Sequence, residues 1–471
     1  MSLNGLLTKM NDIMYTYILI VLLVGVGVYF TIKTRGVQFR LLKDGIQSML
    51  EPSKKEGGEQ KVSSFQALMI STASRVGTGN IAGIATAIAA GGAGAVFWMW
   101  LMALLGGASA FVESTLAQIY KVQDKDEFRG GPSYYMERAL GKRWMGVLFA
   151  ILLIICFAYG FNALQSYNMS SALEYYIPDY SNTYYPVLLG ILLAIAAGVV
   201  IWGGVHRISF ITSVLVPVMA AIYILMGLVT VILNISELPH ILAVILKDAF
   251  DIQAVTGGFA GSAVVIGIKR GLFSNEAGMG SAPNASASAD VEHPVKQGLV
   301  QVISVFIDTI LICSSTAMML LCSGVEGKSG VLDGIPYVQA AISSNVGKWG
   351  IHFITFSMFA FAFSSLIGNY YYAESNMMFI KNDKRLLFIF RITCLLAIFL
   401  GAQMDFSLIW NIADITMGFM AIVNIIAIFL LGKIAFKTLE HYEQQKREGK
   451  NPVFYEDEIG ITGTVWTRKK D

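Results

Sequence analysis

The chain has 471 residues, of which 55% are hydrophobic and only 14% are charged, and its mean hydropathy is +0.61. This composition lies outside the range of soluble domains and indicates an integral membrane protein. The net charge of +2 provides no basic field for nucleic acid and no acidic tract typical of disorder. The four cysteines lie in or near apolar runs without metal-ligand spacing, so we interpret them as small buried apolar residues.

Eleven segments are long and apolar enough to cross a bilayer, because about 20 helical residues span the roughly 30 Å hydrocarbon core. The first has no small-residue cleavage site after it, so it reads as a retained span and not as a signal peptide. We therefore predict an all-α membrane protein with about 11 transmembrane helices, near residues 12–32, 64–90, 93–120, 144–176, 184–203, 209–234, 253–289, 297–323, 349–379, 386–402 and 408–433.

Lysine and arginine set the expected orientation, because cytoplasmic loops are enriched in these residues. The loop after the first span carries seven of them and the loop after the third carries six. The loops 91–92, 177–183 and 403–407 carry none. We therefore expect the N-terminus outside and the C-terminus in the cytoplasm.

Two of the predicted spans are interrupted. Gly77 and Gly79 lie near the middle of the second span, within RVGTGNIAG, although glycine is a poor helix residue. The seventh span contains three glycines, Glu276 and a proline within GLFSNEAGMGSAP. Non-helical backbone at this depth is tolerated only where it is buried in protein or lines a wet cavity. Close helix packing is the alternative reading, which we favour for the glycines at 91–107 but not for Gly77 and Gly79. A dinucleotide loop is rejected, because GxGxxxG here lacks a βαβ context.

The two interrupted spans lie five apart, and because five is odd they cross the bilayer in opposite directions. This arrangement predicts an inverted repeat of five plus five helices, with the first span as an addition. Such paired breaks point to a midplane binding site, where freed amides suit a carboxylate and freed carbonyls suit a cation. The chemistry implied is binding and not bond cleavage, so we expect no enzyme. The predicted divisions are an N-terminal helix and loop, two five-helix repeats and a cytoplasmic tail, at 1–63, 64–252, 253–433 and 434–471.

Ionisable side chains at membrane depth cost about 3 kcal/mol or more on insertion scales, so they are functional candidates by default. Six stand out: Arg75, Glu113, Lys269, Arg270, Glu276 and Asp308. Two readings stay open, namely direct roles in transport and gating, or mutual neutralisation. The second reading pairs Arg270 with Glu276 and Glu113 with the amides of a broken helix. We expect Asp308 to be a cation or gating group and Glu113 to be structural.

Neutral oxygens also suit sodium, which prefers several hard ligands. Hydroxyls and amides are available in three spans, although lone serines in such helices usually bond to their own backbone. Phe161, Asn162 and Gln165 of the fourth span are candidates to face the cavity. The candidates for ion ligands are Ser74, Asn80, Thr309, Ser364 and Ser365.

Long motifs in this chain closely resemble the alanine/glycine:cation symporter family. They are ASRVGTGNIAGIATAIAAGGAGAVFWMW, FRGGPSYYMERALG, GIKRGLFSNEAGMGSAPNASASA, HPVKQGLVQVISVFIDT and IGNYYYAESN, at 73–100, 128–141, 267–289, 293–309 and 367–376. The resemblance covers the membrane domain and implies a leucine-transporter-type fold. It also implies a bacterial or archaeal inner-membrane protein that couples uptake of alanine or glycine to sodium, and in some members to protons.

Residue by residue, the resemblance implies contacts to the substrate and to sodium. The substrate residues would be Gly77, Thr78, Gly79, Gln165, Phe273 and Asn275. Sodium would be held by carbonyls of Ala73 and Val76 and by the hydroxyls of Ser364 and Ser365, an assignment that rests on fold analogy alone. The family usually has GGPGA where this chain reads GGAGA at 91–95, a change expected to affect stability more than substrate choice.

The expected function is sodium-coupled symport of alanine or glycine by alternating access, with sodium as coupling ion, no other cofactor and no obligatory protein partner. Proton-coupled symport of the same substrates is the first alternative. The second is a sensor or channel without coupled turnover, although we find neither filter loops nor a sizeable soluble output domain. Glu113, Arg270, Glu276 and Asp308 are the expected gating or structural charges.

Overall fold

The computed structural model describes residues 3–52, 55–56, 59–124, 127–177, 179–251 and 262–468. Among these residues, seven helices are long and apolar enough to cross a membrane: Asn4–Lys33, Gly94–Ile119, Arg143–Ser171, Arg207–Leu233, Pro294–Leu321, Trp349–Ile380 and Phe406–Arg447. Two shorter apolar helices are Gly79–Gly91 and Tyr185–Ile201. The all-α membrane character is confirmed, whereas the exact number of eleven spans stays a prediction.

The first part of the chain builds the N-terminal helix and the first broken span. Its elements are α1 (Leu3–Ile13), α2 (Ile20–Lys33), α3 (Val37–Arg40), α4 (Leu42–Leu50), β1 (Lys55–Glu56), β2 (Glu59–Gln60), α5 (Ser64–Arg75), α6 (Ile84–Gly91), α7 (Gly94–Ile119), β3 (Val122–Asp124), β4 (Glu127–Arg129) and α8 (Pro132–Arg138). The strands form two antiparallel hairpins, β1–β2 and β3–β4.

The remainder of the chain is helical throughout its regular elements. These are α9 (Arg143–Leu153), α10 (Asn162–Ser171), α11 (Tyr185–Ile201), α12 (Gly204–Leu233), α13 (Leu238–Ala249), α15 (Ala263–Asn275), α16 (Pro283–Ser286), α17 (Pro294–Val305), α18 (Ser314–Leu321), α19 (Gly334–Val346), α20 (Trp349–Ile380), α21 (Lys384–Gly401) and α22 (Phe406–Arg447). Helix α22 continues past the predicted span end at 433 as far as Arg447. The predicted repeat boundary at 252/253 lies outside the described residues.

Both interruptions predicted from glycine are present. Helix α5 starts at a capping box, in which Ser63 Oγ accepts from the Gln66 amide and Gln66 Oε1 accepts from the Ser63 amide. It ends at Arg75, and a π-helical segment, Gly79–Gly83, leads into α6. Helix α15 ends at Asn275, and the chain then passes through left-handed backbone at Glu276 before α16 begins.

The two broken spans run antiparallel. Helix α6 packs against α15, and α5 packs against α16. The second half of one broken span therefore lies beside the first half of the other, which is the relation that an inverted repeat requires.

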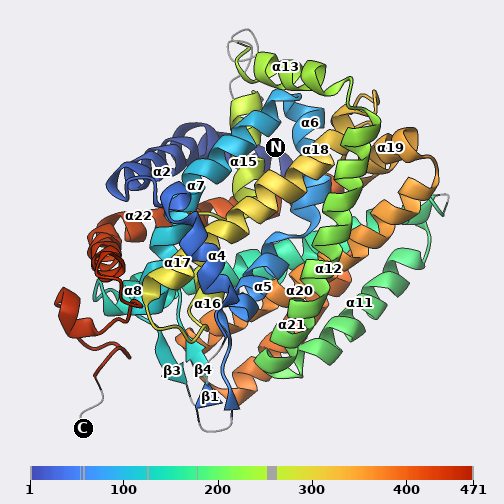
Figure 1. The fold of residues 1–471 in the computed structure, drawn as a ribbon. Helices are drawn as coiled ribbons and strands as arrows, with labels where there is room; N and C mark the ends of the chain where they lie inside the picture. Colours follow the sequence, from blue (N-terminus) through green and yellow to red (C-terminus); the bar gives the residue numbers. More distant parts are fainter. Residues whose placement is uncertain are drawn as a thin grey trace.

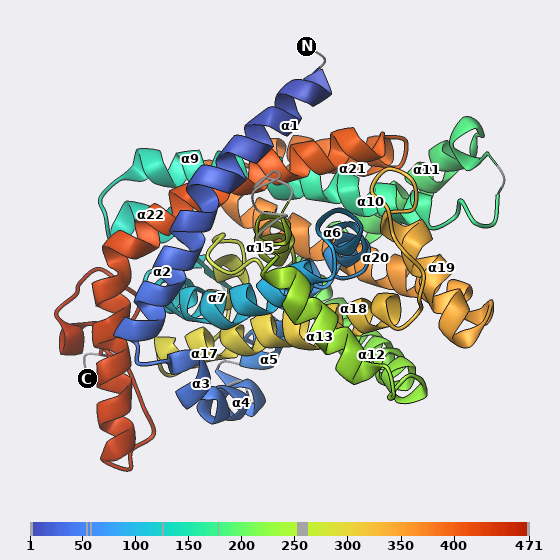
Figure 2. The same cartoon turned by 90° about the horizontal axis from the view of Figure 1, so that it is seen from above.

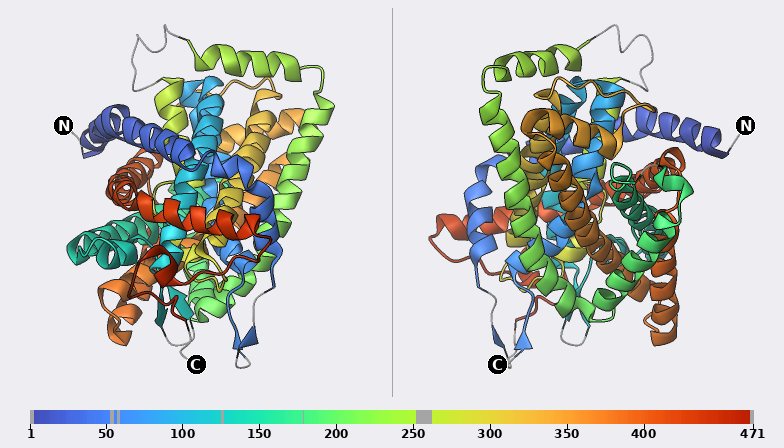
Figure 3. Two further views of the ribbon diagram at one scale, coloured as in Figure 1. Left: turned by 60° about the vertical axis from the view of Figure 1, so that its left-hand side comes forward. Right: turned by 90° about the vertical axis from the view of Figure 1, so that its right-hand side faces the viewer.

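The molecule has two distinct ends. Helices α13 and α19 lie at the top and right of Figure 1, whereas β1, β3, α8 and the C-terminus lie at the bottom and left. Both panels of Figure 3 show α13 at the top and the C-terminus at the bottom. The loops 33–61 and 121–143 are rich in lysine and arginine, and they connect to the elements at the end that holds β1, β3 and α8. We call this end the basic face.

The first and last long helices of the chain pack together, since α1 and α2 run beside α22 in Figure 2. Asn11 Nδ2 donates to Asn411 Oδ1 at 2.9 Å, and the Tyr15 hydroxyl donates to the Asp414 carbonyl at 3.0 Å. The predicted additional N-terminal helix is therefore a packed part of the membrane domain.

Candidate functional site

The break between α5 and α6 places backbone amides in contact with side chains. The Gly77 amide donates to Asn80 Oδ1 at 3.0 Å, and the Thr78 amide donates to Gln165 Oε1 at 3.1 Å. A Cβ atom on Gly77 would collide with Ser365 Oγ and would lie 2.9 Å from Gln165 Nε2. Glycine is therefore required at residue 77, because the broken backbone approaches both the fourth span and α20 closely.

Aromatic rings line the next turn. A Cβ atom on Gly79 would lie 2.6 Å from Cε1 of Phe273, so the α15 ring packs directly on the π-helical backbone. Phe273 also contacts Phe161 and Trp410, with ring centroids 4.9 Å and 5.2 Å apart. Of the predicted substrate residues, Gly77, Thr78 and Gln165 thus lie in contact with one another, as do Gly79 and Phe273.

Asn275, the sixth predicted substrate residue, ends α15. Its Oδ1 accepts from the Ala277 amide at 3.0 Å, so half of this side chain stabilises the break itself. Among the described residues its Nδ2 has no hydrogen-bond partner although it is buried, and the same holds for the hydroxyl of Thr78. Buried polar atoms without partners are costly, so these two groups suit a polar ligand.

Three of the four predicted sodium ligands converge. The Ser365 hydroxyl lies 2.9 Å from the Ala73 carbonyl and 3.3 Å from the Val76 carbonyl, and 3.1 Å from that of Ser74. The Ser364 hydroxyl instead donates to Phe361 O in its own helix at 2.8 Å and contacts Met219. The oxygen cluster around Ser365 has the hard, neutral character that suits a desolvated monovalent cation.

Asp308 lies beside the same break. Its carboxylate accepts from Asn80 Nδ2 and from Ser274 Oγ, each at 2.6 Å, and from Thr309 Oγ1 at 2.9 Å. Asn80 in turn holds the Gly77 amide. Asp308 is therefore tied to the first broken span through Asn80 and to the second through Ser274.

Two other predicted carboxylates brace the second break. Glu276 accepts from Ser74 at 3.0 Å and from Ser281 at 2.5 Å. Glu113 accepts from the Gly278 amide at 3.3 Å and from Asn424 Nδ2 at 2.9 Å. The suggestion that Glu113 binds amides of a broken helix is thus correct.

The suggested pair of Arg270 with Glu276 is wrong. Arg270 binds Asp414 of α22 with both of its terminal nitrogens, at 3.1 Å and 2.9 Å, and Lys269 binds the same carboxylate at 2.6 Å. The left-handed turn at Glu276 directs its carboxylate towards Ser74 and Ser281. Arg75 is buried and donates from Nη1 to Gln301 Oε1 at 3.3 Å.

Sequence reasoning missed Asp414. The signal was present, because Asp414 is a carboxylate inside the apolar run 408–433, the same criterion that identified the six other charges. Trp410, one turn earlier, was missed as well. Arg270 lies 4.3 Å from its ring centroid, and its buried indole nitrogen has no hydrogen-bond partner in the part of the chain that the structure describes.

Freed amides, freed carbonyls and buried charges gather where two discontinuous helices meet, which is the arrangement found at the midplane sites of secondary transporters. The solved structure of MhsT in complex with L-phenylalanine aligns with a TM-score of 0.58 at 13% identity, covering 81% of this chain and 99% of MhsT. The fold is thus of the leucine-transporter type.

The profile of the sodium:alanine symporter family matches residues 1–456. The chain is 48% identical to the probable sodium/glutamine symporter GlnT of Bacillus subtilis, over 95% of this chain and 92% of GlnT. It is 35% identical to the sodium/alanine symporter AgcS of Methanococcus maripaludis, over 96% of this chain and all of AgcS. The chain therefore belongs to the sodium:alanine symporter family, and it is a membrane transporter and not an enzyme.

Proposed function

We propose that this protein couples the inward movement of sodium to uptake of a small neutral amino acid, alanine or glycine, by alternating access. The observation that carries the proposal is the convergence of Gly77–Gly79, Gln165, Phe273 and Ser365 at the meeting point of the two broken spans. The family supports amino-acid symport as the activity.

In this mechanism the substrate carboxylate binds at the amides of Gly77 and Thr78, displacing the contacts of Asn80 and Gln165. Sodium binds among the carbonyls of Ala73 and Val76 and the hydroxyl of Ser365, with Ser364 turning towards it. The ion thus bridges α5 and α20, and the substrate bridges α5 and α15. One group of helices then rocks against the other around this site, and each ligand favours the state that the other stabilises.

The basic face is proposed to be cytoplasmic, with the N-terminus outside and the protein in a prokaryotic inner membrane. The support is the excess of lysine and arginine in loops 33–61 and 121–143.

Glutamine is the second candidate substrate. GlnT, named as a probable sodium/glutamine symporter, is more similar to this chain than AgcS is. The unpartnered Asn275 Nδ2 and Trp410 Nε1 also provide donors for a side-chain carboxamide. A larger polar substrate therefore has specific support from this site.

Uptake of labelled amino acid into proteoliposomes tests the proposal. An imposed inward sodium gradient is expected to accumulate alanine above equilibrium, with potassium in place of sodium as the control. Accumulation driven only by a pH gradient would mean that the coupling ion is a proton and not sodium. Binding without accumulation would indicate a sensor. Excess unlabelled glutamine should compete weakly. Stronger competition by glutamine than by alanine would mean that glutamine is the preferred substrate.

A further inference from the structure

The chain after α22 folds back over the basic face. We call residues 451–466 the tail. The Phe454 amide donates to Glu292 O at 3.0 Å, and Asn451 Nδ2 donates to the Glu292 carboxylate at 2.6 Å. The Trp466 indole nitrogen donates to Gln118 O at the end of α7, at 2.9 Å. The Phe454 and Trp466 rings also contact each other, with centroids 5.5 Å apart.

The tail binds where the two broken spans end on this face. The Asp290 amide donates to the Val62 carbonyl at 3.0 Å, which joins the segment after α16 to the entry of α5. Lys61 forms an ion pair with Asp290 at 3.6 Å. A cavity of about 620 Å³ lies here, and its walls include Lys61 and Ser64, Asp290 and Glu292, and Phe454 and Trp466.

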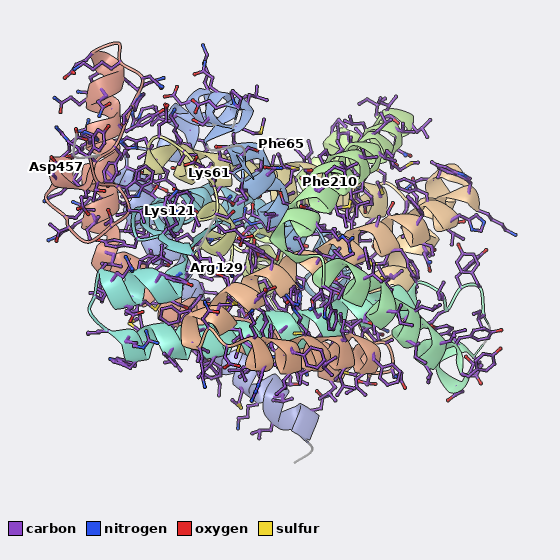
Figure 4. All side chains as sticks on the ribbon, turned by 90° about the horizontal axis from the view of Figure 1, so that it is seen from below. Lys61, Phe65, Lys121, Arg129, Phe210 and Asp457 are labelled. Carbon is purple, nitrogen blue, oxygen red and sulfur yellow. The ribbon has the colours of Figure 1, made fainter. Side chains whose placement is uncertain are left out.

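Lys121 joins the tail to the second broken span. Its amine is buried, donates to the Ala289 carbonyl at 2.8 Å and lies 4.0 Å and 4.8 Å from the ring centroids of Phe128 and Trp466. Gln118 reinforces this link, because its Nε2 donates to the carbonyls of Ser286 and Ala289. Figure 4 shows Lys61 and Lys121 next to each other, with Asp457 of the tail to one side.

We propose that the tail is a latch that holds the basic-face ends of the two broken spans together and so opposes opening of the transporter on that side. Opening requires residues 62–67 and 284–292 to separate, which would break the Asp290–Val62 bond and the Lys61–Asp290 ion pair. The tail opposes this separation because Asn451 and Phe454 hold Glu292, and Trp466 holds the end of α7. The inference rests on the proposed alternating access, which requires these ends to move.

Hydrogen exchange of the full-length protein in detergent tests the latch. Trp466→Ala removes the bond to Gln118 and the ring beside Lys121. Loss of these contacts should accelerate amide exchange in residues 62–67 and 284–292 about tenfold, because the hydrogen bond and the ring packing that hold the tail are both removed. Trp466→Phe, which keeps a ring but loses the indole donor, should give an intermediate acceleration. Thr462→Ala, an exposed tail residue, is the matched control and should change nothing.

Unchanged exchange in 62–67 and 284–292 in a chain that ends at Lys450, which lacks the tail, would overturn the latch. So would unchanged exchange in Trp466→Ala when the tail itself exchanges freely. If Trp466→Ala does not yield folded protein, Trp466→Phe decides by the same criterion. The measurement uses no substrate, so its outcome is separate from whether alanine or sodium is transported.

Discussion

At the scale of single residues, the site depends on two glycines, because a side chain at either residue would collide with its neighbours. Gly77 and Gly79 allow the backbone of one broken span to lie against Ser365, Gln165 and Phe273. The sequence predicted these glycines because they interrupt an apolar span. It did not predict Asn80 as the side chain that holds the Gly77 amide, since that contact depends on how the chain turns after the break.

Gly79→Ala is expected to lower substrate affinity about tenfold or more, because its Cβ would overlap the Phe273 ring and such overpacking costs about 1–3 kcal/mol. The concentration of alanine that half-saturates uptake measures the effect. Gly25→Ala in the first span is the matched control, because no described atom outside its own stretch of helix lies within 4 Å of the added Cβ. Equal affinities for the two variants would mean that the Phe273 wall lies outside the binding site.

Ser365→Ala removes the hydroxyl that lies among the carbonyls of Ala73, Ser74 and Val76. The expected result is a rise of about tenfold in the sodium concentration needed for half-maximal uptake, since one ligand to a charged group contributes roughly 1.5–3 kcal/mol. Ser364→Ala should give a smaller rise, because that hydroxyl already bonds to Phe361 O. A larger effect at Ser364 than at Ser365 would contradict the proposed ion position.

At the scale of elements, the sequence predicted which spans break and that they run antiparallel, because periodicity and glycine position are local signals. It could not predict charge partners across the bundle. Arg270 was paired with Glu276, six residues away in sequence, whereas its partner Asp414 lies on α22, and only the packing of α15 against α22 brings the two charges together.

Asp414→Asn should destabilise the fold by about 3–5 kcal/mol, because it leaves the charges of Lys269 and Arg270 buried without their carboxylate. The thermal unfolding midpoint in detergent measures the loss. Asp405→Asn, at the exposed start of the same helix, is the control, since asparagine caps a helix as well as aspartate does. Similar midpoints for the two variants would show that the triad contributes little to stability.

At the scale of the whole molecule, the distribution of lysine and arginine predicted two different ends, but the packing of residues 451–466 on one of them had no signal in the sequence beyond its aromatic residues. The tail buries Phe454 and helps to bury Lys121 and His293. Burial lowers the pKa of Lys121 from 10.5 to about 7. Burial, together with His441 and Lys296, also holds the pKa of His293 well below 6.5.

These shifts make release of the tail depend on pH. If release of the tail exposes both bases to water, the released state binds more protons, and release becomes easier as the pH falls from about 10 to 7 for Lys121, and again below 6.5 for His293. Burial is the main cause of the Lys121 shift, and Asp290 and Lys61 are the charges that face its amine. A nitroxide on Thr462→Cys in a Cys322→Ser background should therefore become more mobile at pH 7 than at pH 9. Lys121→Met in the same labelled protein should abolish that difference in mobility. An identical pH dependence with Lys121 and with Lys121→Met would mean that other groups cause it.

The most direct test of the central claim is reciprocal coupling. If sodium and alanine bind together at the junction of the broken spans, an inward alanine gradient should drive labelled sodium into proteoliposomes above its equilibrium level, without any imposed sodium gradient. The expected result is sodium accumulation that depends on alanine and is lost in Ser365→Ala. Alanine entry that leaves the sodium distribution at equilibrium would contradict coupled transport at this site.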